Sequence, residues 1–443
     1  MHYKYIFFIG LLLPIINYAE QEINNEHIHI SVQAQKTKKV SIGLVLLGNY
    51  DKNLEKCINR IQKDLEWSNQ CNVIIKHCKK IKHETEMKKI FDEDDVAIAL
   101  FLSKEDMRYS WRLYDLLSLT MVSGTSIDQG DMSISMIAHT IADDIWPQLF
   151  NQLNSFRSKI VYAKQIWRMK HGREKPYKQI WIADFDGSNA QLFIDAPTIS
   201  FAPRWNNDLN CPLLFYSQNT LSNIQLVMNN MFGKRQVICS FDGLNMQPTF
   251  SDDGKKVVLC LSKDGTSQLY MSFIDMKSHQ RKLDRLTFNS GNNLAPCFID
   301  SGTIVFVSDF ETNKPQVYSL DLKTKQIQRI TQGGYCACPN YSSVRRQLVY
   351  SKMMDDGVMQ LFLYDFKTKK HNQLTFGSGN KEEGCWSVCG NYIIFSVNEW
   401  SKSRIAQLHL QTNKIHYLTS DHEHCTYPHC SPIYNEYLGI LNK

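Results

Sequence analysis

Histidine and cysteine side chains gather in two stretches near the C-terminus of this 443-residue chain, and these residue types can bind zinc. Neither stretch contains the complete ligand spacing of a tetrahedral zinc site. We therefore predict no metal site and interpret both stretches as polar loops, with metal binding kept as an alternative. The residues concerned are His422, His424, Cys425, His429, Cys336 and Cys338.

Two other kinds of chemistry need motifs that this sequence does not contain. A serine hydrolase of the α/β type carries its nucleophile in a GxSxG sequence, and Gly377-Ser378-Gly379 has a different pattern. Gly43 and Gly48 are not followed by the GxGxxG or GKS sequence of a phosphate-binding loop. The sequence therefore predicts no enzymatic activity and no cofactor.

Length and charge restrict the classes of protein to which the chain can belong. A chain of 443 residues is too long for one small core, so we predict two domains. The formal net charge of +6 is spread along the sequence and does not form the basic stripe that nucleic-acid binding usually requires. We therefore expect a solvated surface of mixed charge and no nucleic-acid partner.

The N-terminus has the features of an export signal. His2 and Lys4 precede an apolar run over residues 5–16, and Ala19 offers a small residue before a cleavage site. The run is too short to span a bilayer comfortably, and no later segment is apolar enough to cross one. We predict a signal peptide over residues 1–19, cleavage near Ala19, and a mature chain without a membrane span. An exported monomer with 13 cysteines must leave a thiol unpaired; we interpret most as buried free thiols and leave their pairing open.

The C-terminal two thirds of the chain repeats a pattern of short strands. One marker, a Gln that opens an apolar strand, recurs about every 45 residues, and Leu-Thr pairs and Pro-x-aromatic triplets recur in the same phase. Six units of about four strands predict an all-β six-bladed β-propeller over residues 158–443. The aromatic residues of the triplets should pack between blades. The six glutamines are Gln179, Gln225, Gln268, Gln316, Gln360 and Gln407.

The first and last units must share a blade for the ring to close. The first unit begins at Lys159 with a sequence that matches the second strand of later units, so its innermost strand is missing. Residues 426–430, left over after the sixth unit, match that missing strand. We therefore predict that residues 426–430 pair with residues 160–163.

Residues 39–152 lack this period and alternate between strand-like and helix-like segments. Buried-type strands are predicted over residues 40–47, 72–77 and 96–102, and helices over residues 52–67 and 84–91. A hairpin over residues 107–125 and a helix over residues 131–150, capped by Asp131, complete the domain. The predicted fold class is an α/β N-terminal domain followed by the propeller.

Several segments resemble the TolB family. They are Asp252-Asp253-Gly254, Lys263-Asp264-Gly265 and Gln268-Leu269-Tyr270 of the third blade, Ser308-Asp309 and Gln316-Val317-Tyr318 of the fourth, and His139-Thr140-Ile141-Ala142-Asp143 before the propeller. Residues 28–32 and 42–45 resemble the family's mature N-terminus. The resemblance implies a periplasmic part of the Tol–Pal envelope system that supports outer-membrane integrity and constriction at division, without a cofactor or a catalysed reaction.

The resemblance also implies two partners. A Pal-like peptidoglycan-associated lipoprotein would bind at the mouth of the propeller channel, and a TolA-like protein would bind an N-terminal docking strand within residues 20–38. Ile28, Ile30 and Val32 alternate with polar residues there, as expected for a strand that adds to a sheet edge. This segment would either dock on its own domain or be released to the TolA-like protein.

Loops that enter the inner strands supply the predicted lipoprotein-binding residues. The family favours a His where this chain has Leu244 and a Thr-Glu pair where it has Leu294-Ala295, so either the Pal-like partner has changed as well or this chain binds another ligand. An exported propeller for another ligand and the cap of a hydrolase stay open as alternatives. The predicted binding residues are Leu244, Asn245, Gln247, Asn292, Asn293, Leu294, Tyr335, Lys381, Glu382, Glu383 and His424.

Overall fold

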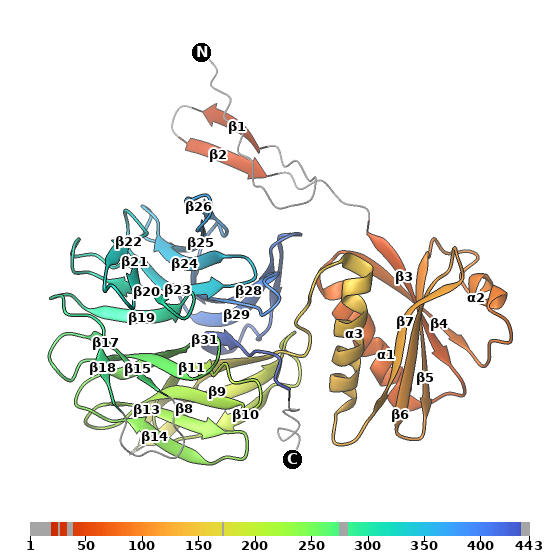
Figure 1. Ribbon diagram of the computed structural model, residues 1–443, viewed down its shortest axis with the longest axis horizontal. Coiled ribbons are helices and arrows are strands. Elements are labelled where there is room, and N and C mark those ends of the chain that lie inside the picture. The colour runs from red at the N-terminus through yellow and green to blue at the C-terminus, as the bar shows by residue number, and fades with distance from the viewer. Residues whose placement is uncertain (1–18, 25–26, 33–38, 171, 274–281, 436–443) are drawn as a thin grey trace.

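The structure is a computed structural model that describes residues 19–24, 27–32, 39–170, 172–273 and 282–435. An α/β domain lies beside a β-propeller, and the propeller is seen nearly along its axis in Figure 1. No helix in the described ranges is long and apolar enough to cross a bilayer. The predicted signal peptide lies outside the described residues apart from Ala19.

The α/β domain is built on a five-stranded sheet in the order β4-β3-β5-β6-β7. The first three strands of that order are parallel, and β6 and β7 form an antiparallel hairpin at one edge. Helices α1 (Lys52–Trp67) and α3 (Ile134–Phe150) share a core with one face, and α2 (Thr85–Lys89) packs on the other. The strands are β3 (Val40–Leu47), β4 (Cys71–Cys78), β5 (Ile98–Glu105), β6 (Arg108–Asp115) and β7 (Thr120–Asp128).

Local side-chain bonds decide where the two long helices begin. The Asp51 carboxylate accepts hydrogen bonds from the backbone N–H groups of Asn53 and Leu54 and so caps α1. The prediction that Asp131 caps the last helix is wrong. The cap is Ser133, whose hydroxyl accepts the N–H of Met136, so α3 begins three residues later than predicted. Ser133 thus satisfies one of the first backbone N–H donors of α3, the role that was predicted for Asp131.

Four blades of the propeller are separate four-stranded antiparallel sheets. In each of them the first strand lies nearest the axis and the fourth lies at the rim (Figure 1). The second blade is β11 (Ser200–Trp205), β12 (Leu213–Asn219), β13 (Ile224–Asn230) and β14 (Arg235–Cys239); the third is β15 (Asn245–Phe250), β16 (Lys256–Leu261), β17 (Gln268–Phe273) and β18 (Asp284–Arg285). The fourth is β19 (Asn293–Phe298), β20 (Thr303–Ser308), β21 (Gln316–Asp321) and β22 (Ile327–Arg329); the fifth is β23 (Cys336–Ser342), β24 (Gln347–Met353), β25 (Met359–Asp365) and β26 (Lys370–Gln373).

The first and sixth blades join in one eight-stranded sheet through a single parallel pair, Ser403 and His424. The prediction of ring closure is confirmed, because the C-terminal strand β31 pairs antiparallel with β8, Thr426 opposite Ala163 and Cys430 opposite Ile160. The sixth blade is β27 (Asn380–Trp386), β28 (Tyr392–Glu399), β29 (Lys402–His409) and β30 (Lys414–Tyr417). The first is β31 (His424–Cys430), β8 (Lys159–Lys170), β9 (Arg173–Asp184) and β10 (Gln191–Ile194).

Packing between blades uses the aromatic residues of five inner strands, four of them two residues after a proline and Trp386 two residues after Gly384. Trp205, Phe250, Phe298 and Trp386 are buried in the apolar clusters between blades, and Tyr341 is partly buried there. This confirms the predicted packing role. Each blade thereby buries both of its faces against its neighbours.

Every inner strand also contains one residue with a positive φ angle, which lies directly before the proline or, in the sixth blade, before Gly384. At each of these positions the register with the second strand shifts. A β-bulge of this kind bends the strand and redirects the side chains near it. The six residues are Ala202, Gln247, Ala295, Cys338, Glu383 and Tyr427.

The segment predicted to be a docking strand lies within β2 (His27–Val32), which pairs antiparallel with β1 (Ala19–Asn24). Ile28 is opposite Ile23 and Ile30 is opposite Gln21. This pair forms a two-stranded sheet of its own and is not part of the five-stranded sheet of the α/β domain (Figure 1).

Candidate functional site

The predicted lipoprotein-binding residues lie where the inner strands begin, at one end of the propeller. We call this end the mouth. Neighbouring inner strands are tied together here: the side-chain oxygen of Gln247 accepts the Ala295 N–H at 2.8 Å, and the Glu383 carboxylate accepts the Tyr427 N–H at 2.6 Å. The entering loops of the third to sixth and first blades therefore face the same side around one axis.

Two asparagines of the predicted set are buried and bind their own loops. Asn245 donates to the carbonyls of Ile224 and Phe241 and accepts the N–H of Phe241. Asn293 donates to the side-chain oxygens of Gln268 and Asn289, at 3.0 and 2.8 Å. Both side chains have no exposed surface, so they position the loops and do not face a partner.

Lys381 has the same role in the sixth blade, although it is charged. Its ammonium donates to the carbonyls of Phe376, Gly377 and Ser378 at 2.5 to 3.0 Å, which holds this loop closed over it. Burial lowers the pKa of Lys381 because it removes the ammonium from bulk water, and the Glu399 carboxylate acts against this change.

The two glutamates that follow, Glu382 and Glu383, each accept a hydrogen bond from the second strand of the same blade. Glu382 accepts the side-chain amide of Asn398 at 2.7 Å, and Glu383 accepts the Ser396 hydroxyl at 2.6 Å. Burial raises the pKa of Glu383. Arg204, from the inner strand of the second blade, is the cation that acts against this rise, and its guanidinium donates to the Pro203 carbonyl.

The remaining members of the set form the accessible surface of the mouth. Tyr335 is 41% exposed, and Leu244, Gln247, Leu294 and His424 are each partly exposed. Asn292 is exposed while its backbone N–H and side-chain amide both bind Asp309. The mouth therefore presents apolar and aromatic groups on loops whose polar side chains are already satisfied. Such a surface suits binding of a protein and offers no paired acid, base and nucleophile.

The histidine and cysteine loops do not converge on a common point. His422 is exposed, whereas Cys425 is buried with its thiol facing the Glu423 carboxylate. His429 accepts the Trp205 N–H through Nδ1, and burial lowers its pKa. Within the described ranges, no group of three or more His, Cys, Asp or Glu residues is placed to hold a metal ion.

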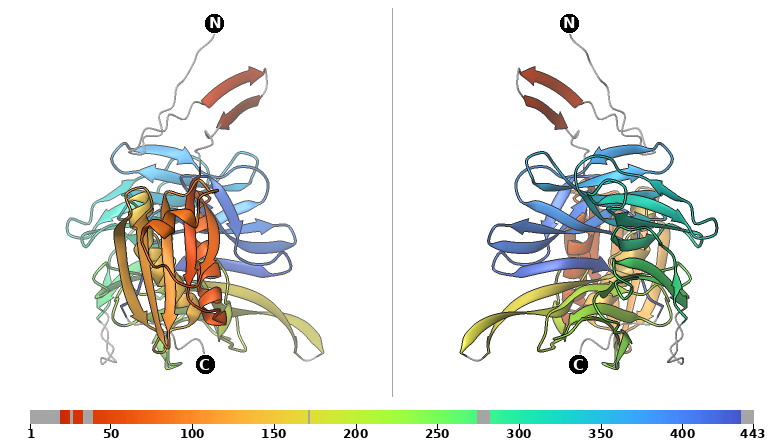
Figure 2. Two further views of the ribbon diagram at one scale, coloured as in Figure 1. Left: turned by 90° about the vertical axis from the view of Figure 1, so that its right-hand side faces the viewer. Right: turned by 90° about the vertical axis from the view of Figure 1, so that its left-hand side faces the viewer.

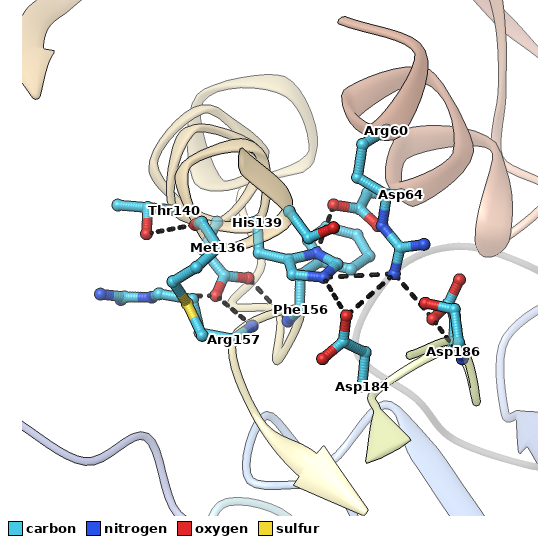
Figure 3. A network of polar contacts seen from close by, with 12 residues as sticks. Arg60, Asp64, Met136, His139, Thr140, Phe156, Arg157, Asp184 and Asp186 are labelled. Carbon is cyan, nitrogen blue, oxygen red and sulfur yellow. Dashed lines mark hydrogen bonds and ion pairs between the residues drawn. The ribbon is translucent and has the colours of Figure 1, made fainter. Parts of the chain in front are cut away.

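A second polar cluster joins the two domains. His139 on α3 is fully buried between Asp64 of α1, at 2.7 Å from Nδ1, and Asp184 of the propeller, at 3.4 Å from Nε2 (Figure 3). Arg60 of α1 reaches across to Asp186 at 2.7 Å, and Lys159 binds Asp184 from within the first blade. We call these six residues the interdomain cluster.

Charge balance sets the protonation of this cluster. Burial alone would lower the pKa of His139, but the carboxylates of Asp64 and Asp184 outweigh it and raise that pKa to about 9. Burial would likewise raise the pKa of Asp184, yet His139 and Lys159 hold it well below its usual range. The sequence showed His139 only as part of a family-like helix, because its partners are 75 and 45 residues away along the chain.

Three comparisons relate the chain to known proteins. The family described as "TolB beta propeller domain" matches residues 147–434. Two curated proteins from Francisella tularensis, subspecies mediasiatica (strain FSC147) and tularensis (strain FSC 198), are each named "Tol-Pal system protein TolB" and are 26% identical over 220 residues. These alignments cover 48% of this chain, and the chain spans about half the length of the curated relatives it matches (49% and 48%).

A crystal structure of TolB from Acinetobacter baumannii has the same fold, with a TM-score of 0.73 over 89% of this chain and 98% of that chain. The sequence identity in that comparison is 19%, so it bears on the architecture alone. The predicted fold class and the predicted family are confirmed. On the match over residues 147–434, the chain belongs to the family of TolB β-propeller proteins.

Proposed function

We propose that this protein is a non-catalytic periplasmic scaffold of the Tol–Pal envelope system and that its mouth binds a Pal-like lipoprotein. The observation that carries the proposal is that buried side chains hold the loops of the mouth while other side chains face outward. Asn245, Asn293 and Lys381 hold the loops from within, so the outward-facing side chains are positioned without a partner. A preorganised surface loses little conformational entropy on binding.

The names of the relatives support the same function. The curated proteins from Francisella tularensis are named as Tol–Pal system proteins, and the match to them covers 220 residues. Location in the periplasm and support of outer-membrane integrity and constriction at division follow from the same proposal. Of the alternatives weighed against it, a metal-binding propeller finds no group of three or more His, Cys, Asp or Glu placed to hold a metal ion among the described residues, and a hydrolase cap finds no GxSxG sequence in the chain.

Charge placed on the mouth tests the proposal. Replacing Leu244 and Leu294 together with Asp would bury unpaired carboxylates under the partner, and we expect a loss of about 2 kcal/mol or more in binding free energy. The measurement is calorimetric titration with the Pal-like lipoprotein of the same organism. Leu209→Asp with Val344→Asp is the matched control, because both residues are exposed on turns at the opposite end of the propeller.

Unchanged affinity in the folded double variant of the mouth would contradict the proposal. Circular dichroism of both double variants separates lost binding from lost folding. Tyr335→Ala gives an independent test at a side chain that is 41% exposed, where truncation leaves the core intact.

We propose further that the N-terminal docking strand, which includes Ile28, Ile30 and Val32, binds a TolA-like protein by adding to a sheet edge. Deleting residues 20–32 should abolish binding of the TolA-like protein and leave binding of the Pal-like lipoprotein in place. The two affinities are measured on the same preparation, so that a general loss of folding is recognised. TolA-like binding that survives the deletion would refute this role.

A further inference from the structure

The second and third strands of the first blade are longer than their counterparts in every other blade. β8 and β9 have 12 residues each, whereas the equivalent strands of the other blades have six to eight. The extra length extends past the mouth, because the inner strand β31 begins opposite Gln165. Figure 2 shows the long β8–β9 hairpin projecting beyond the rest of the propeller.

The projecting part is a two-stranded ribbon, residues 166–170 paired with residues 173–177. Among the described strands, β31 pairs with β8 only as far as Gln165, and β10 pairs with β9 only at residues 180–182. Neither strand reaches the projecting part of the hairpin. An isolated two-stranded ribbon is marginally stable in water, so retaining its shape requires support at its base. Arg168 supplies this support: it forms an ion pair with Asp195 at 2.5 Å and lies over the ring of Tyr177 at 5.7 Å.

The two faces of the ribbon differ in chemistry. Residues opposite one another in an antiparallel pair share a face, and successive residues alternate between faces. One face therefore carries Trp167, which is 56% exposed, Met169, which is 68% exposed, and the exposed Pro176 and Glu174, with Glu174 opposite Met169. The other face carries Arg168 and Lys175, which are opposite each other, and Arg173.

The apolar face is directed toward the second blade. Val161 and Ala163 lie on the same face of β8, and they pack with Trp205 and Leu214 of the second blade. Trp167 and Met169 continue that face past the mouth, where no described residue of the propeller buries them. Leu221, in the turn between β12 and β13 of the second blade, is fully exposed at the same end.

We propose that the ribbon is a second docking element of the mouth. Its Trp167 and Met169 side chains contact the protein that is bound at the mouth. The inference rests on the proposed function and deepens it, since the occupant is the protein seated on the mouth. That protein presents apolar side chains to the face of Trp167 and Met169 and carries acidic charge, which Arg173 and Lys175 on the other face attract at a distance. A bilayer is the less suitable occupant, because Glu174 is exposed opposite Met169 on the same face and would have to enter the membrane with it.

The test removes the apolar face while keeping the ribbon. Trp167→Ser with Met169→Ser should weaken binding of the Pal-like lipoprotein at least tenfold in calorimetric titration, because aromatic anchors dominate interface energies. Phe232→Ser is the matched control, since Phe232 is 78% exposed on the turn between β13 and β14 at the opposite end; its affinity should stay within twofold. Arg173→Gln with Lys175→Gln should mainly slow association and reduce its dependence on salt.

A second variant excludes an artefact of misfolding. Replacing residues 166–177 with Asn-Gly leaves residues 159–165 and 178–184, so each strand has the length found in the other hairpins; it removes both Trp167 and Met169 and leaves the pairing of β31 with β8 intact. It should lose as much affinity as the serine double variant. Co-sedimentation with phosphatidylglycerol vesicles is measured in parallel.

The outcomes are distinguishable. If the wild-type chain binds the lipoprotein and Leu244→Asp with Leu294→Asp abolishes binding, but both ribbon variants bind within twofold of wild type, the ribbon inference is overturned and the proposed function stands. If the wild-type chain does not bind, both are overturned. Co-sedimentation that depends on Trp167 and Met169, with lipoprotein affinity unaffected, would assign the ribbon to a membrane surface and overturn the inference as stated.

Discussion

The mouth and the interdomain cluster use charge in opposite ways. In the interdomain cluster, His139, Asp64 and Asp184 are buried together and are each other's main partners (Figure 3). In the mouth, Lys381 and Glu383 bind groups of their own blade or of the next one, and apolar side chains face outward. The cluster therefore fixes one domain on the other, whereas the mouth fixes only itself and keeps its contact surface available.

Removing one member of the interdomain cluster should have the largest effect. Asp184→Ala leaves His139, Lys159 and Arg60 without their shared carboxylate, and breaking a buried ion pair in this way costs about 3–5 kcal/mol. We expect the free energy of unfolding to fall by that order in urea denaturation, with the two domains unfolding in separate transitions. Asp195→Ala, which removes an exposed ion pair with Arg168, should cost less than 1 kcal/mol. Equal losses in the two variants would show that the cluster does not join the domains.

The pH dependence of stability should reveal the same cluster. The pKa of His139 is about 9 in the folded chain and near 6.5 when unfolded, so its contribution is complete below pH 6.5 and is lost as pH rises through 9. The difference between these two pKa values corresponds to at most about 3 kcal/mol in the free energy of unfolding. Arg60 Nη2, which lies 3.2 Å from His139 Nε2, opposes this protonation and reduces the contribution of His139 below that limit. Unfolding measured at pH 6, 7.5 and 9 should show the decline in the wild type and a flat profile in His139→Gln. A decline that persists in His139→Gln would assign the titration to another group.

Lys381→Met tests whether the mouth is organised from within. The variant keeps the packing of the alkyl chain but removes the donor for three loop carbonyls, and we expect a loss of about 1–3 kcal/mol in stability. Affinity for the Pal-like lipoprotein should fall as well, since the Phe376–Ser378 loop is no longer held. Lys370→Met, on the outer strand β26, is a control for removing a lysine from an exposed position. A wild-type affinity in Lys381→Met would mean that the sixth-blade loop lies outside the interface.

The smallest expected effect distinguishes Ser133, which caps α3, from Asp131, which was predicted to cap it. Ser133→Ala should destabilise the α/β domain by about 1 kcal/mol, because it removes the acceptor for the Met136 N–H. Asp131→Ala should change stability by less than half of that, since Asp131 precedes the cap and is exposed. Thermal unfolding of both variants checks the prediction, and a larger shift in Asp131→Ala would reverse the assignment.

Local patterns predicted the elements well where the pattern was strong. The strand Val40–Leu47 and the helix Lys52–Trp67 have the predicted bounds. An apolar run indicates the strand, and an amphipathic stretch with a capping residue indicates the helix, so each is recognised from its own residues. The start of α3 was misplaced because Asp131 and Ser133 are both good caps, and the choice between them depends on the strand that precedes the helix. Ring closure was predictable because the C-terminal segment repeats an inner-strand sequence.

The site was less predictable, because the sequence shows the repeat phase of each loop residue but not which phase is buried. Asn245 occupies the phase that is buried in all six blades, three residues before the proline or Gly384, whereas Tyr335 occupies the preceding phase and is 41% exposed. The ring of positive-φ residues also has no common residue type, since it includes Ala202, Cys338 and Glu383. The ribbon could have been suspected from the longer interval between Tyr162 and Gln179, and the interdomain cluster joins residues too far apart in sequence for any local pattern to connect.

Closure of the ring by β31 also sets an order of assembly. A chain emerges from the ribosome with its N-terminus first, so the strand that completes the first blade becomes available after the strands of the other five blades. Asp184 belongs to that first blade and contacts His139 and Arg60 of the α/β domain. A chain interrupted anywhere before His424 would therefore lack the inner strand of the blade that supplies this interdomain contact. The blade that meets the α/β domain is thus the last of the six to be completed during synthesis.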